Sequence, residues 1–210
     1  MTELWLVRHG QTDWNLAGRW QGQTSNAPGL NETGRAQELS IREGLQGIGF
    51  SALYSSDLLR ARQTAELIAE PLGLTVTLEP RLREMNLGSW EGLCSEEIEA
   101  RYPHELAERA RNPFYSRAPN GESPCEVAER VLTAIDLIAN KHRSETVLIV
   151  SHGIVLATVM CCTMGFPLED IYQHVPGNAE PYRVQWLPER LLNMGETHAS
   201  RPLSFAIQAN

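Results

Sequence analysis

The sequence predicts an α/β protein with three α/β/α layers, in which helices cover both faces of a mostly parallel central sheet. Two observations predict this class. Short apolar segments alternate along the chain with longer segments of helical periodicity, which is typical of strand–helix–strand units. The 210 residues, 42% of them apolar, are also enough for one domain with its own core, and no internal repeat interrupts them. We therefore expect a single domain over residues 1–210.

Five segments are expected to form strands. Residues 3–8, 51–55 and 146–151 are short and rich in apolar residues, and each is followed by polar residues or glycine. The third is apolar at consecutive positions, which is typical of a strand buried on both faces. Residues 75–78 and 182–187 carry a less regular strand pattern.

Five segments have helical periodicity. They cover residues 32–46, 58–71, 95–111 with an interruption at Pro103, 124–141 and 154–164. The start of the fourth helix is the most sharply marked, because Ser123 and Glu126 have the spacing of a capping box and Pro124 occupies the first helical position.

Between residues 91 and 121 the pattern loosens into charged residues, three prolines and an aromatic pair, Phe114-Tyr115. We expect this segment to be a helical excursion that covers the functional site. The alternative is a plain surface hairpin of helices that contacts no ligand.

Composition excludes several classes of function. The formal net charge of −8 would repel a nucleic-acid backbone, so no nucleic-acid partner is expected. No apolar run approaches the roughly 18 residues of a membrane span, and no basic segment followed by an apolar block opens the chain. We expect a soluble, cytoplasmic protein without a membrane partner. The four cysteines have no CxxC spacing and are expected to be reduced thiols.

Residues suited to binding an anion follow three of the expected strands. They are Arg8-His9-Gly10, the segment from Ser55 to Arg60, and Ser151-His152-Gly153. Taken singly, such a histidine is often a turn residue and such an arginine a surface ion-pair partner. If the strands are parallel neighbours, however, their carboxyl ends meet in one crevice. Arg60 would also lie in the first turn of a helix, where free N–H groups favour an anion.

These segments belong to a longer series of motifs. The matching stretches, in chain order, are Arg8-His9-Gly10-Gln11-Thr12 with Asn15, Gln21-Gly22, Leu30-Asn31-Glu32-Thr33-Gly34, Ser55 to Ala65, Leu82 to Gly92, Gly121-Glu122-Ser123 and Ser151-His152-Gly153. With this order and spacing, the chain resembles the histidine phosphatase superfamily, also called the phosphoglycerate mutase-like family, over most of residues 3–165.

The resemblance implies the roles of five residues. His9 would be the nucleophile that forms a covalent phosphohistidine, and Arg8, Arg60 and His152 would hold the phosphoryl oxygens. Glu84 stands at the position of the family's usual acid, which protonates the leaving group and later activates water. These roles agree with the chemistry, since a transferring phosphoryl group needs fixed donors around its oxygens. His9 must attack as a neutral imidazole, which the two arginines favour.

Four further residues are candidate substrate-binding groups: Asn15, Gln21, Gly22 and Gly153. Asn15 and Gln21-Gly22 lie in the loop after the expected nucleophile, where amide groups and backbone N–H groups can contact phosphate. A purely turn-forming role for this loop is the alternative.

No metal or other cofactor is expected. The four aspartates never occur at DxD spacing, and no pair of histidines stands at zinc-ligand spacing. A P-loop is absent, and neither Cys94 nor Cys125 has an arginine at the C-x₅-R spacing of a cysteine-dependent phosphatase.

The leading hypothesis is therefore a metal-independent phosphomonoesterase that acts on a small phosphorylated metabolite through a phosphohistidine. Arg101, Arg109 or Arg111 could bind a carboxylate, which would fit a phosphoserine- or phosphoglycerate-type substrate.

Two alternatives stay open. A cofactor-dependent phosphoglycerate mutase would use the same phosphohistidine, but the chain is shorter than typical family mutases. In addition, Ile154 follows His152-Gly153 where mutases usually have Asn, and residues 91–121 contain no Lys. A non-catalytic relative that only binds phosphorylated ligands would need neither His9 nor Glu84.

A homodimer is also considered. The apolar segment from Leu187 to Phe205 could pair two subunits, although edge-strand packing within one subunit explains it equally well.

Overall fold

The computed structural model describes residues 1–187, and its centre is a five-stranded sheet in the order β3-β2-β4-β1-β5. The strands are β1 (Thr2–Arg8), β2 (Phe50–Ser55), β3 (Val76–Leu78), β4 (Thr146–Ser151) and β5 (Pro181–Trp186). The first four are parallel, and β5 pairs with β1 in the antiparallel direction at one edge. All five predicted strands are present, each within one residue of the expected bounds.

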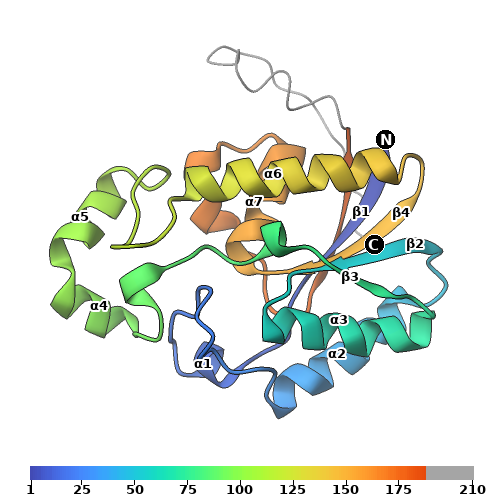
Figure 1. The fold of residues 1–210 in the computed structure, drawn as a ribbon, viewed down its shortest axis with the longest axis horizontal. Coiled ribbons are helices and arrows are strands. Elements are labelled where there is room, and N and C mark those ends of the chain that lie inside the picture. Colours follow the sequence, from blue (N-terminus) through green and yellow to red (C-terminus); the bar gives the residue numbers. More distant parts are fainter. Residues whose placement is uncertain (188–210) are drawn as a thin grey trace.

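Helices cover both faces of the sheet, so the predicted three-layer architecture is confirmed (Figure 1). Helices α2 (Glu32–Leu45) and α3 (Leu59–Leu72) pack together on one face, and α6 (Pro124–Lys141) and α7 (Gly153–Met164) on the other. The predicted capping box is observed, because the Glu126 N–H donates to Ser123 Oγ at 3.3 Å and the Ser123 N–H donates to Glu126 Oε2 at 2.8 Å.

Shorter elements complete the fold. They are α1 (Asp13–Leu16), α4 (Ser95–Arg101), α5 (Pro103–Arg111) and the 3-10 helices η1 (Pro80–Leu82), η2 (Gly88–Trp90) and η3 (Leu168–His174). The expected helix over 95–111 is two helices, because Pro103 begins α5 after a break at Tyr102. The sequence prediction missed α1 and the 3-10 helices, since segments of three to seven residues are too short to show periodicity.

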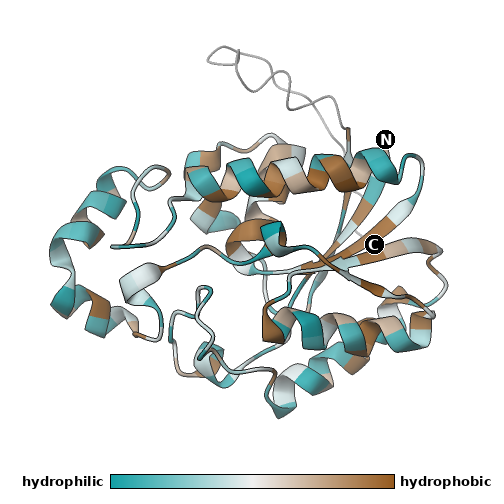
Figure 2. Cartoon of the chain, viewed as in Figure 1, coloured by the Kyte–Doolittle hydropathy of each residue, from teal (hydrophilic) through white to brown (hydrophobic). Residues whose placement is uncertain are grey.

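The core has two parts because strand side chains alternate between the faces of the sheet. In β4, Val147 and Ile149 belong to the cluster under α6 and α7, whereas Leu148 and Val150 belong to the cluster under α2 and α3. All four are fully buried, as expected for a strand covered on both faces. Figure 2 shows the corresponding apolar strands and apolar helix stripes facing the sheet.

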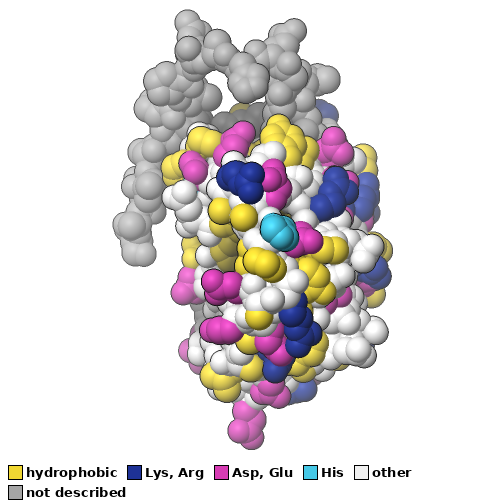
Figure 3. All heavy atoms as spheres, turned by 90° about the vertical axis from the view of Figure 1, so that its left-hand side faces the viewer, with side chains coloured by type: hydrophobic (Ala, Val, Ile, Leu, Met, Phe, Trp, Pro, Cys, Tyr) yellow, Lys and Arg dark blue, Asp and Glu magenta, His cyan; other side chains and the backbone are white. Residues whose placement is uncertain are grey.

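The excursion at residues 91–121 forms one end of the molecule, where α4 and α5 extend beyond the sheet (Figure 1). Ile98 and Phe114 anchor it in the larger core cluster. On the face that this end presents, side chains of both charges are interspersed with apolar ones (Figure 3). This face therefore carries no extended patch of one charge.

Two further sequence expectations concern membrane-spanning helices and a homodimer. Among residues 1–187, no single helix has the length and apolar character to cross a membrane; α7 and η3 meet that criterion only as a pair bent by 119°. Nearly all of the segment from Leu187 to Phe205, on which the dimer expectation depends, lies outside the described residues.

Glu38 is an acidic residue in the core. It lies on the buried face of α2 with Gly34, Ile41 and Leu45, and its side chain is fully buried. Neither carboxyl oxygen has a hydrogen-bond partner of good geometry among the described residues. Burial raises the pKa of the Glu38 carboxyl to about 8, against smaller lowering contributions from the Thr64 side chain and the Gly10 backbone. Glu38 is therefore mostly protonated at neutral pH.

This burial has a measurable consequence for stability. Between pH 4.5 and about 8 the unfolded chain has released the Glu38 proton and the folded chain still holds it. The free energy of unfolding should therefore fall as the pH rises through this window. We expect Glu38→Gln to remove this part of the decline, so that the variant gains stability relative to wild type from pH 5 to pH 8 in urea denaturation.

Glu43→Gln is the matched control, because Glu43 is exposed on the same helix. It should run parallel to wild type. A Glu38→Gln profile that also runs parallel to wild type would show that the Glu38 carboxyl is ionised in the folded protein.

Candidate active site

A cavity of about 300 Å³ opens at the carboxyl ends of β1, β2 and β4. It collects most of the residues that the sequence singled out as site residues. Those that line it are Arg8, His9, Asn15, Gln21, Gly22, Arg60, Glu84 and Gly153. Four arginines but only one acidic residue, Glu84, line the cavity, so it is suited to an anionic ligand.

His9 follows β1 directly and is only 2% exposed. Its Nδ1 lies 2.8 Å from the Gly10 carbonyl oxygen, which can only accept a hydrogen bond, so Nδ1 carries the proton. Its Nε2 lies 3.1 Å from Arg60 Nε, which can only donate, so Nε2 presents a lone pair. Both contacts select one neutral tautomer of the imidazole.

Electrostatics favours the same neutral form. Burial lowers the pKa of His9 well below its usual value, and the guanidinium groups of Arg60 and then Arg8 lower it further. The carbonyl of Gly10 opposes these effects only in part. His9 is therefore a neutral imidazole with its free nitrogen directed at a guanidinium group.

The two arginines come from different elements. Arg60 lies in the first turn of α3, as predicted, and its Nη2 donates to the Gly22 carbonyl oxygen at 3.0 Å. Burial lowers the pKa of Arg60 to about 10, which leaves it charged at neutral pH. Arg8 ends β1 and donates from Nη1 to the Pro176 carbonyl oxygen at 2.7 Å, while its buried Nε has no partner among the described residues.

His152 lies beside His9 but does not line the cavity. It is the residue before the first turn of α7 and is fully buried, with the two imidazole centroids 5.2 Å apart. Its Nε2 is 2.8 Å from Ser56 Oγ, and its Nδ1 has no partner among the described residues. Burial lowers the pKa of His152 well below its usual value, with a further contribution from Arg60.

Glu84 faces Arg8 and Arg60 from the loop between η1 and η2. Its Oε1 accepts a hydrogen bond from the Met85 N–H at 2.8 Å, and its Oε2 accepts one from the Ile154 N–H at 3.4 Å. Gly153 lies beside it: a Cβ atom there would lie 3.6 Å from Glu84 Oε2 and 3.6 Å from the Arg8 guanidinium carbon. The same Cβ atom would lie 2.8 Å from Val175 Cγ1, so a side chain at this position would crowd the cavity wall.

The loop after His9 has the turn-forming role, and it also lines the cavity. Asn15 Oδ1 accepts from the Thr12 N–H at 3.1 Å and so caps α1, while its side chain also lines the cavity. Gln21 is buried, and its Oε1 lacks a partner among the described residues. Gly22 has φ +51°, and a Cβ atom there would lie 2.1 Å from Glu91 Oε1, so only glycine fits.

Arg109 is the single member of the excursion that lines the cavity. Its guanidinium carbon lies 4.3 Å from the ring centroid of Tyr172, 4.8 Å from that of Trp20 and 5.4 Å from that of Trp90. Burial lowers the pKa of Arg109, and no acidic side chain among residues 1–187 forms an ion pair with it. By contrast, Arg101 and Arg111 pair with Glu97 and Glu108 at the surface and do not line the cavity.

Sequence reasoning missed several of the lining residues, notably Arg19, Trp20 and Tyr172. Tyr172 lies in η3, far along the chain from the motifs, and a single aromatic residue in a short helix has no distinguishing pattern. Trp20 immediately precedes the Gln21-Gly22 motif, which was the available signal.

The described residues contain no cluster of three or more His, Cys, Asp or Glu side chains that could hold a metal ion. The chemistry that the lining residues offer is that of fixed positive charge, one neutral imidazole and one carboxyl group. Such a set can bind a phosphate group and place a nitrogen lone pair against its phosphorus atom.

Comparisons with known proteins agree with this chemistry. A family model described as "Histidine phosphatase superfamily (branch 1)" matches residues 4–193. The chain is 37% identical over 170 residues to the "Probable phosphoglycerate mutase GpmB" of Erwinia tasmaniensis, covering 80% of this chain and 77% of that protein. It is 33% identical over 190 residues to phosphoserine phosphatase 1 of Hydrogenobacter thermophilus, covering 90% of this chain and 89% of that protein.

The fold is also similar to that of a solved phosphatase structure. The mycobacterial glucosyl-3-phosphoglycerate phosphatase in complex with VO3 superposes with a TM-score of 0.77 at 33% identity, covering 86% of this chain and 91% of that one.

Proposed function

Because the chain belongs to the histidine phosphatase superfamily, we propose that it is a metal-independent phosphatase that hydrolyses small phosphorylated metabolites through a phosphohistidine at His9. The observation that carries the proposal is the state of His9, a buried neutral imidazole whose Nε2 lone pair faces the phosphate-binding guanidinium groups. A site that only binds phosphate has no need of such a nitrogen.

In the proposed first step, His9 Nε2 attacks the phosphorus atom and the bond to the ester oxygen breaks. Arg60 Nε then donates to a phosphoryl oxygen instead of to Nε2, and Arg8 takes a second oxygen. The Nδ1 proton stays with His9, where its hydrogen bond to the Gly10 carbonyl stabilises the positive charge that develops on the ring. Glu84 gives its proton to the leaving oxygen, and the alcohol departs.

In the second step, water hydrolyses the phosphohistidine. The Glu84 carboxylate takes a proton from the water molecule as its oxygen attacks phosphorus. The phosphorus–nitrogen bond breaks, inorganic phosphate leaves, and both His9 and Glu84 return to their starting protonation states. His152, whose ring centroid lies 5.2 Å from that of His9, is proposed to help hold the phosphoryl oxygens.

The substrate class follows from Arg109. A half-buried guanidinium group without an ion-pair partner among the described residues favours a ligand that brings a second anionic group. Three aromatic rings fix its position, so little entropy is lost when it binds. We therefore propose a phosphomonoester that also carries a carboxylate, as phosphoserine- and phosphoglycerate-type compounds do. Of the three arginines considered from the sequence, the structure favours this one.

A phosphoglycerate mutase is the second candidate, and the similarity to a protein named as a mutase supports it. Transfer back to a bound phosphoglycerate would need a bisphosphate to stay in the cavity, whereas a phosphatase only needs access for water. The two are distinguished by product, as described below.

The first test concerns His9. We expect His9→Ala to lower the turnover of p-nitrophenyl phosphate in EDTA by more than about a thousandfold, because no other group supplies the nucleophile. Wild type should acquire an acid-labile, base-stable phosphate label that the variant lacks. His104→Ala, at an exposed position on α5, is the control and should keep both.

Loss of wild-type activity in EDTA would contradict the metal-independent reaction. Isomerisation of 3-phosphoglycerate that requires 2,3-bisphosphoglycerate, without net phosphate release, would identify a mutase instead.

The second test concerns Arg109. A hydrogen bond to a charged group contributes about 1.5–3 kcal/mol, so Arg109→Met should lower kcat/KM for phosphoserine or 3-phosphoglycerate by about 10- to 100-fold. The value for p-nitrophenyl phosphate, which has no carboxylate, should stay within about threefold of wild type.

Arg101→Met is the matched control from the same excursion, since Arg101 is exposed and pairs with Glu97. It should leave both substrates unchanged. An equal loss on both substrates in Arg109→Met would rule out carboxylate recognition by this residue.

A further inference from the structure

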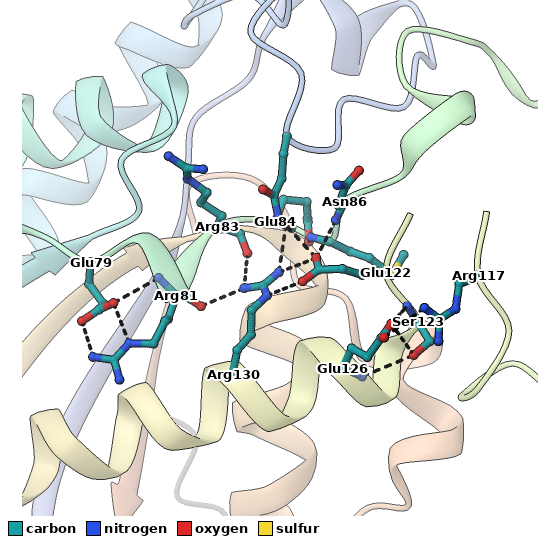
Figure 4. Close-up of polar contacts among 12 residues, drawn as sticks. Glu79, Arg81, Arg83, Glu84, Asn86, Arg117, Glu122, Ser123, Glu126 and Arg130 are labelled. Atoms are coloured by element: carbon teal, nitrogen blue, oxygen red, sulfur yellow. Dashed lines mark hydrogen bonds and ion pairs between the residues drawn. The ribbon is translucent and has the colours of Figure 1, made fainter. Parts of the chain in front are cut away.

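Arg130 of α6 reaches across to the loop that carries Glu84 (Figure 4). Its guanidinium group has five N–H donors, and the structure uses all of them. Nε and Nη2 donate to the two carboxylate oxygens of Glu122 at 2.8 and 2.9 Å. Nη1 donates to the carbonyl oxygens of Arg81 and Arg83 at 2.8 and 2.7 Å, and Nη2 also donates to that of Glu84 at 3.0 Å.

Glu122 extends the same network past Glu84 (Figure 4). Its Oε2 accepts a hydrogen bond from the Asn86 N–H at 2.8 Å and one from Gln23 Nε2 at 3.3 Å. Gln23 Nε2 in turn donates to the Glu84 carbonyl oxygen at 2.8 Å. The backbone is therefore held on both sides of Glu84 by one ion pair between Arg130 and Glu122.

These hydrogen bonds hold a backbone segment that belongs to no helix or strand. Glu84 lies between η1 and η2, so neither a helix nor a strand of the sheet fixes its backbone. Among residues 1–187, the carboxyl group of Glu84 has two hydrogen bonds, and both come from backbone N–H groups. The position of this carboxyl group thus depends on how firmly its backbone is held.

We propose that Arg130 is a positioning residue that holds Glu84 at the distance and angle needed for proton transfer to the leaving group. The inference depends on the proposed function, in which Glu84 is the acid. A general acid must lie within about 2.6–3.2 Å of the atom it protonates, and a displacement of about 1 Å can lower the rate about a hundredfold. Arg130 never contacts substrate in this account, since it does not line the cavity.

The leaving group provides a readout that a purely structural role would not change. An alkyl phosphate needs its leaving oxygen protonated, whereas p-nitrophenolate leaves with little assistance. We expect Arg130→Met to lower kcat for a simple alkyl phosphate by about 10- to 100-fold and kcat for p-nitrophenyl phosphate by less than about threefold. Glu84→Gln should show the same selectivity at larger amplitude.

The double variant tests whether the two residues act together. If Arg130 acts through Glu84, Arg130→Met should cause less than about a threefold further loss on the alkyl phosphate in the Glu84→Gln background. Arg81→Met is the matched control, because Arg81 lies in η1, just before the loop that carries Glu84, and its side chain pairs with Glu79. It should change the two substrates to the same small extent.

Arg130→Lys is the second variant, and it carries the comparison if Arg130→Met does not fold. Lysine offers three donors on a flexible stem in place of five in a planar fork, so a smaller selective loss on the alkyl phosphate is expected. Selective loss in either Arg130 variant, with no further loss in the double variant, supports the proposal.

Two results would overturn it. The positioning role is wrong if Glu84→Gln is selective but the Arg130 variants slow both substrates equally. It is also wrong if an Arg130 substitution lowers the rate as much in the Glu84→Gln background as in wild type. In either case the proposed function stands. If Glu84→Gln itself shows no selectivity, the acid assignment fails and the inference fails with it.

Discussion

The site depends on keeping one imidazole uncharged between two guanidinium groups. A histidine exposed to water becomes protonated at moderately acidic pH. In His9, burial and the charges of Arg60 and Arg8 disfavour the cation, and the Gly10 carbonyl favours it only in part. The same arginines that would bind the phosphate oxygens therefore also prepare the nucleophile. A phosphate dianion in the cavity would add negative charge beside His9. It would therefore stabilise the positive charge that develops on the imidazole during phosphoryl transfer.

The sheet produces this arrangement by bringing three chain segments to one edge. Parallel register places the end of β1 next to the end of β4, and β2 next to β4 on its other side. Arg8, His9, Arg60 and His152 follow from that order, although they come from distant parts of the sequence. The side of the cavity at Arg109 is built differently, because Arg109 comes from the excursion and Tyr172 from η3.

The sequence predicted the layers, all five strands, the main helices and the meeting of Arg8, His9 and Arg60 at one cavity, because each of these has a local signature. The side-chain networks had no such signature. The rings around Arg109 come from Trp20, Trp90 and Tyr172, which no spacing connects, so the sequence could not select it over Arg101 or Arg111. Glu38 is different: it shares the helical spacing of the buried residues Gly34 and Ile41, so the sequence did contain the signal for a buried acid.

The most direct measurement of the central claim is the protonation state of His9 itself. Nitrogen-15 NMR of the imidazole side chains, assigned by comparison with His9→Ala, reports which ring nitrogen carries a proton between pH 6 and pH 8. The expected result is a neutral ring in this range, with the proton on Nδ1 and a lone pair on Nε2 directed at Arg60. A His9 that is cationic at pH 7, or that carries its proton on Nε2, would contradict it.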